Sequence, residues 1–234
     1  MRRVSQREAL DHWLACEGAA PDDRAESRRP RDSDAVDRLL RANPGAAAFL
    51  WRDAPIRWYH TVLSPEQLPR LRVIEGPEET LWNALSPDGT VGGAAARVAA
   101  ERASILRAET GVDAVRIREL AVRIQAAMTG EATLVEATEE DEWTAAARTE
   151  STLDGLPDLV CVRRRPWHRP FIADGNHRAV AAAAVAGERG ETPRVGAYLG
   201  VGRNRPVEDV RRAATAVGWS IRRRLFGDSE PNAF

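Results

Sequence analysis

Alternation of apolar and polar side chains predicts the strands of this chain. The clearest alternation runs from Ile56 to Leu63. Two short β-rich runs, at residues 159–162 and 170–173, flank a turn that contains Pro166, which is typical of a hairpin. Other short apolar runs predict strands at residues 71–74, 133–137 and 194–199.

Apolar residues at helical spacing lie between these runs. A helix over residues 5–16 starts with Ser5 and Glu8, the spacing of a capping box. An alanine-rich helix over 177–186 is expected to end at Gly187 as its C-cap. Further helices or helical turns are predicted at residues 34–42, 82–85, 94–109, 112–128, 139–148 and 207–225. This mixture of elements predicts an α+β fold.

Composition shifts suggest how the chain is divided. Residues 17–34 are rich in Gly, Pro, Asp, Arg and Ser, which predicts a mobile linker. We therefore expect a partly disordered helical extension at residues 1–48 and an α+β domain at 49–205. A helical insertion at about 86–150 belongs to that domain, and a helical tail follows at 206–234.

The composition limits the chemistry that the chain can perform. Of its 234 residues 43% are hydrophobic, and the formal net charge is −1, so no global positive field attracts nucleic acid. All 34 basic residues are arginines, in keeping with a GC-rich, bacterial coding sequence. The lack of lysine excludes Schiff-base chemistry and the P-loop lysine.

The two cysteines and the N-terminus exclude other classes. Cys16 and Cys161 are far apart in sequence and belong to no Cys/His cluster, so neither a zinc site nor a disulfide is supported. The first residues lack an apolar signal sequence, and no apolar run is long enough to span a bilayer. We expect a cytoplasmic protein that does not bind a membrane.

The segment Asp174-Gly175-Asn176-His177-Arg178 is the strongest candidate site. It stands between a predicted strand and a predicted helix, where the first N–H groups of the helix attract an anion. Gly175 permits a tight turn, and Asn176 is a favourable N-cap. His177 and Arg178 follow in the first turn and can contact the same anion. Asp174 can hold a hydroxyl group, position a metal ion, or orient Arg178.

The run from Phe171 to Ala182, with Gly187 and the strand at 194–199, resembles the ParB/sulfiredoxin-like superfamily. Members of this superfamily often carry an Asp-Gly-X-His-Arg signature between a strand and an alanine-rich helix. The resemblance covers about residues 158–200. The strand from Ile56 and the turn after it are more weakly similar to the family's first strand and helix. The resemblance implies a small mixed sheet with an unusually large helical insertion.

The resemblance implies a nucleotide-binding enzyme: a phosphotransferase of the kinase type or an NTP hydrolase. Gly175, Asn176, His177 and Arg178 would bind the phosphates of ATP, ADP or CTP, and Asp174 and His177 would act in catalysis. Glu66 matches the family's carboxylate base, with Glu75 in reserve. Mg²⁺ is expected with the nucleotide. The acceptor, a small molecule or a macromolecule, and the oligomeric state, a homodimer included, remain open.

Two alternatives remain open at this point. A nucleic-acid-associated ParB-like regulator or nuclease is favoured by the arginine clusters at residues 163–165 and 222–224, although the balanced net charge makes DNA a less favoured partner. Residues from His168 to Arg178 also echo the Fic signature of nucleotidyltransferases, although the interval from His168 to Gly175 is two residues too long. Trp167, beside His168, is a candidate for stacking on a base.

Overall fold

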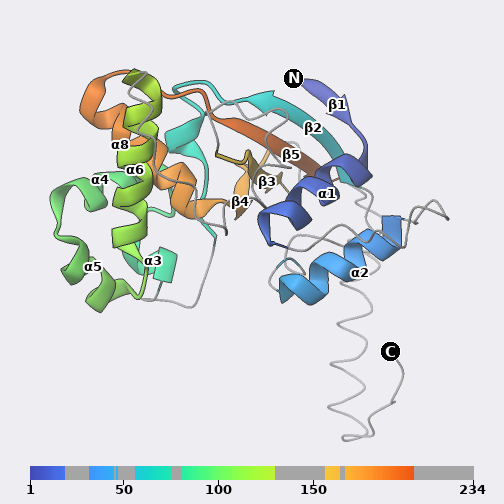
Figure 1. Ribbon diagram of the computed structural model, residues 1–234, viewed down its shortest axis with the longest axis horizontal. Helices are drawn as coiled ribbons and strands as arrows, with labels where there is room; N and C mark the ends of the chain where they lie inside the picture. Colours follow the sequence, from blue (N-terminus) through green and yellow to red (C-terminus); the bar gives the residue numbers. More distant parts are fainter. Residues whose placement is uncertain are drawn as a thin grey trace, which may run out of the picture.

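The structure is a computed structural model, and it describes residues 1–18, 32–44, 46, 56–74, 81–129, 156–163 and 167–202. Within these ranges the chain has an α+β fold, with one five-stranded mixed sheet and seven α-helices (Figure 1). The predicted α+β class is therefore confirmed. None of the helices in the described ranges is long and apolar enough to cross a membrane.

The sheet joins strands from the start, the middle and the end of the described chain. Its strands are β1 (Arg2–Val4), β2 (Ile56–Val62), β3 (Leu159–Arg163), β4 (Phe171–Asp174) and β5 (Gly196–Gly202). Their order in space is β1-β2-β5-β3-β4. β3 and β5 are parallel and the other neighbours are antiparallel. Arg72 adds an isolated bridge to Phe171, so the chain after β2 also runs beside β4.

One face of the sheet is covered by helices from the middle of the chain. The small side chains of α8 (Asn176–Arg189) allow it to pack closely against this face and against its neighbouring helices, and its residues Ala179–Val185 are buried. The elements on this side are η3 (Leu68–Arg70), α3 (Leu81–Leu85), α4 (Val91–Ala100), α5 (Ala103–Thr110), α6 (Ala114–Thr129) and α8 (Asn176–Arg189).

The opposite face is covered by α1 (Gln6–Cys16) and α2 (Asp32–Ala42). Trp13 of α1 and Trp58 of β2 are almost fully buried in the core between the sheet and these helices. Ser5 caps α1 by accepting a hydrogen bond from the backbone of Glu8, as the capping-box spacing predicts. The predicted extension at residues 1–48 thus contributes β1 and two helices to the packing of the main sheet.

Several predicted elements are confirmed, and others are wrong in extent. The strand from Ile56 and the hairpin strands are present, and residues 112–128 coincide closely with α6. The single helix predicted at 94–109 is interrupted, because Glu101 is extended between α4 and α5. The helix predicted to end at Gly187 continues to Arg189, and Gly190 forms the left-handed C-cap at φ 72°. β1 was not predicted.

Some predictions lie outside the described residues. They are most of the linker, the strand at 133–137, the helices at 139–148 and 207–225, the C-terminal tail at 206–234, Glu75, most of the arginine cluster at 163–165, and the cluster at 222–224.

Candidate functional site

The predicted turn lies between β4 and α8. Gly175 adopts a left-handed conformation at φ 94° and forms the N-cap of α8, so the prediction that Asn176 is the N-cap is wrong. A Cβ atom on Gly175 would lie 2.6 Å from Cδ2 of Leu159 and 2.9 Å from Nη2 of Arg178. Conformation and crowding therefore both require glycine here.

Asn176 is the first residue of α8, and its side chain has a structural role. Its Oδ1 accepts a hydrogen bond from the backbone N–H of Ile74 at 3.1 Å, and its Nδ2 donates to the carbonyl of Ile172 at 3.5 Å. The first backbone hydrogen bond of the helix runs from Ala179 to Gly175 at 2.9 Å. The N–H groups of the three preceding residues therefore have no acceptor inside the helix.

Arg178 is held by groups of the protein itself. Its Nη2 forms an ion pair with Oδ2 of Asp174 at 2.6 Å, and its Nη1 donates to the carbonyl of Pro157 at 2.8 Å. Burial on its own lowers the pKa of Arg178, but the charges of Asp174 and Cys16 and the hydrogen bonds to both side chains together raise the pKa above its usual value. The sequence allows Asp174 to hold a hydroxyl group, position a metal ion or orient Arg178. In the structure its carboxylate orients Arg178.

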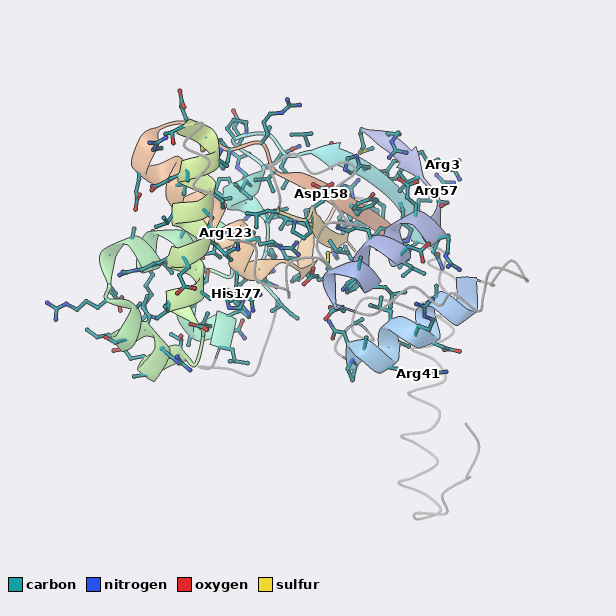
Figure 2. The ribbon with its side chains drawn as sticks, viewed as in Figure 1. Arg3, Arg41, Arg57, Arg123, Asp158 and His177 are labelled. Atoms are coloured by element: carbon teal, nitrogen blue, oxygen red, sulfur yellow. The ribbon has the colours of Figure 1, made fainter. Side chains whose placement is uncertain are left out.

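His177 lies on the other side of the start of α8. Its ring packs edge-on against Trp82 of α3, with ring centroids 4.9 Å apart, and its buried Nε2 has no hydrogen-bond partner among the described residues. Burial lowers the pKa of His177, and the positive charge of Arg116 lowers it further, so the imidazole is neutral at pH 7. Figure 2 shows His177 near the lower end of α6. His177 and Arg178 therefore do not point toward one common anion.

Arg116 is a residue that the sequence analysis missed. It is exposed in the first turn of α6, within electrostatic range of His177. The charge of Arg116 lowers the pKa of His177 more than the charge of Arg178 does. Nothing in the local sequence of α6 links Arg116 to the motif, because the two are brought together only by the packing of α6 against α8.

A second polar cluster, under α1, was also missed. The carboxylate of Asp158 binds Nε2 of His60 at 2.7 Å, and its backbone carbonyl binds Nε2 of His12 at 2.9 Å. Tyr198 stacks on His12 and also contacts His60, with ring centroids 4.5 and 4.9 Å apart. Cys16 joins this cluster to the motif, because its Sγ lies 3.5 Å from His12 Nε2 and 3.9 Å from Arg178 Nη1.

The cluster under α1 lacks an activated nucleophile. A carbonyl only accepts hydrogen bonds, so Nε2 of His12 carries a proton and cannot remove the proton of Cys16. Burial raises the pKa of the Cys16 thiol to about 11, so the thiolate is scarce at neutral pH. Across the described ranges, no group of three or more His, Cys, Asp or Glu side chains is placed to hold a metal ion.

The remaining candidates lie away from the motif. Glu66 is exposed in the turn after β2, and within the described ranges it forms no hydrogen bond or ion pair with the motif. Trp167 and His168 are exposed in the connection between β3 and β4, with ring centroids 6.1 Å apart. His168 thus lies between strands, whereas the Fic signature requires its histidine at the end of a helix.

Comparison with known proteins adds no relative. No family model matches the chain, and no curated protein or solved structure matches it.

Proposed function

We propose that this chain is a nucleotide-binding enzyme of the ParB/sulfiredoxin-like type, which transfers or hydrolyses a phosphoryl group. The observation that carries the proposal is the start of α8. A left-handed glycine leads into a helix of 14 residues whose first N–H groups have no internal acceptor, and a neutral imidazole with an unpaired Nε2 lies beside them. This arrangement suits a phosphate group.

The proposal assigns different tasks to the neighbouring residues of the motif. The backbone N–H groups near Asn176 and the imidazole of His177 would bind a phosphate, with the charge of Arg116 close by. Asp174 and Arg178 would hold the turn in its conformation, because their charges already neutralise each other. Glu66 as the general base remains a prediction. Magnesium would arrive on the phosphates of the nucleotide, where it neutralises their charge.

Nucleotide binding by calorimetry tests the proposal directly. The folded protein is titrated with ATP, ADP and CTP in the presence of Mg²⁺, and at least one should bind. His177→Ala should weaken that binding by about tenfold, because a hydrogen bond to a charged phosphate is lost. His168→Ala, a change at an exposed histidine, is the matched control. If the folded protein binds none of the three nucleotides, the proposal fails.

The pH dependence of binding tests the role of His177 separately. A bound phosphate stabilises the protonated imidazole, so binding should strengthen as the pH falls from 8 to 6. The same trend in His177→Ala would contradict this role.

Release of labelled phosphate from the bound nucleotide tests catalysis. Glu66→Gln should slow this release by about a hundredfold if Glu66 is the base. Transfer of labelled AMP to a protein would instead indicate a Fic-type enzyme.

A further inference from the structure

Four side chains from the three strands β1, β2 and β3 lie on one side of the sheet. Tyr59 pairs with Arg3 and with Leu199, and Val201 pairs with both Arg57 and Arg163. Paired residues of adjacent strands point to the same side of a sheet. Arg3, Tyr59, Arg57 and Arg163 therefore form one surface, which we name the arginine face.

The arginine face lies outside the helix-covered part of the sheet. It is on the same side as Cys161 and Ala197, which are buried under α4, α6 and α8. Val201, between Arg57 and Arg163, is also buried, but it does not belong to the hydrophobic cluster that these helices form. Arg3 and Arg57 are exposed, and Tyr59 and Arg163 are half-buried. Figure 2 shows Arg3 and Arg57 together at one end of the sheet, far from His177.

The described part of the chain does not neutralise the charges of the arginine face. Among the described residues, Arg3, Arg57 and Arg163 form no ion pair, and Nε of Arg163 is buried without a hydrogen-bond partner. The positions of β1, β2, β3 and β5 that share this side include no carboxylate. An unpaired, partly desolvated guanidinium is costly, and an anionic ligand would relieve that cost.

The spacing and chemistry of the face fit one kind of partner. Arg57 and Arg163 are two strands apart, which places their Cα atoms about 10 Å from each other. Tyr59 lies between Arg3 and Leu199 as a flat aromatic surface. Bases of a single strand stack on aromatic rings while arginines contact its phosphates.

We propose that the arginine face binds single-stranded nucleic acid, with phosphates on Arg3, Arg57 and Arg163 and a base stacked on Tyr59. This site is separate from the start of α8, and the inference does not depend on the proposed nucleotide chemistry. Because the partner is held by charge and stacking, little preference for base sequence is expected.

Fluorescence anisotropy with labelled single strands of about 12 nucleotides tests this inference. Oligothymidine and oligouridine probes distinguish DNA from RNA, and binding of either at micromolar protein supports the proposal. Three phosphate contacts on a single strand predict that affinity falls by about 20-fold between about 50 and 200 mM salt. No binding of either probe overturns the proposal, as does tighter binding to duplex DNA or to anionic phospholipid vesicles.

Matched variants locate the binding surface. Arg3→Gln combined with Arg57→Gln should weaken binding by at least about tenfold at low salt and make the salt dependence less steep. Arg41→Gln combined with Arg123→Gln removes two exposed arginines from α2 and α6 and should leave the affinity unchanged (Figure 2). Tyr59→Leu should weaken binding by about tenfold with an unchanged salt dependence. If the control pair weakens binding as much as the Arg3/Arg57 pair, binding is not at this face and the proposal is overturned.

Discussion

The two sides of the start of α8 differ in how completely their polar groups are paired. On the side of α1, Arg178 has Asp174, the carbonyl of Pro157 and the sulfur of Cys16 as partners. On the side of α3 and α6, Nε2 of His177 is buried without any hydrogen bond. Arg178 thus has its polar groups paired within the protein, whereas Nε2 of the neighbouring His177 is unpaired among the described residues. The side of His177 is therefore the better place for a ligand.

The largest effect should follow from breaking the paired side. Arg178→Ala leaves the half-buried carboxylate of Asp174 without its partner, so the free energy of unfolding should decrease by about 3 kcal/mol. Denaturation by urea measures this change. Arg123→Ala, an exposed arginine of α6, should change it by less than about 0.5 kcal/mol.

Removal of both charges sharpens this test. Asp174→Ala combined with Arg178→Ala should be less destabilised than Arg178→Ala alone, because no unpaired charge remains. An Arg178→Ala variant as stable as the wild type would show that the ion pair does not maintain the turn.

A smaller loss of stability is expected when Gly175, at the start of α8, is replaced. Gly175→Ala places a Cβ against Leu159 in a left-handed conformation, and we expect a loss of about 2 kcal/mol. The control is Gly187→Ala within the same helix, where a Cβ meets no atom within 4 Å. That change should instead stabilise the protein by about 0.5–1 kcal/mol, because alanine favours the helix. Thermal unfolding of the two variants should therefore shift in opposite directions.

The smallest effect should come from protonation of the two buried histidines, His177 and His12. Burial lowers the pKa of both His177 and His12 in the folded state, so below about pH 6.5 the unfolded chain binds these protons first. Acidification from pH 7 to 5 therefore favours unfolding, because the unfolded chain takes up these protons more readily. His177→Phe should depend less on pH in this window, whereas His168→Phe should follow the wild type. Equal slopes for the wild type and His177→Phe would contradict the burial of this imidazole.

What the sequence predicted well was local. Gly175 and the alanine-rich run after it indicate a strand, a tight turn and a closely packed helix, and all three are present. The alternation from Ile56 indicates β2, and burial follows it at the start of the strand, where Ile56 and Trp58 are buried and Arg57 is exposed. The break between α4 and α5 was missed because Ala, Arg and Glu favour a continuous helix, and only tertiary packing interrupts it there.

What the sequence could not predict were partners distant along the chain. Arg178 meets Cys16 from 162 positions away, and His60 meets Asp158 from 98 positions away. A guanidinium after a glycine turn suits a phosphate and an internal carboxylate equally well, so the motif alone could not decide between these partners. The position of α1 over the sheet decides it, since α1 brings Cys16 to Arg178 and His12 to Asp158.

The short strand β1 has a consequence for how the protein behaves in concentrated solution. It pairs with one edge of β2. Without it, this strand of seven residues would present free backbone N–H and C=O groups at the edge of the sheet. Only three residues long and carrying Arg2 and Arg3, it is itself a poor template for another chain. Shortening the protein by its first four residues would uncover β2, and the molecules would then be prone to aggregate through strand pairing.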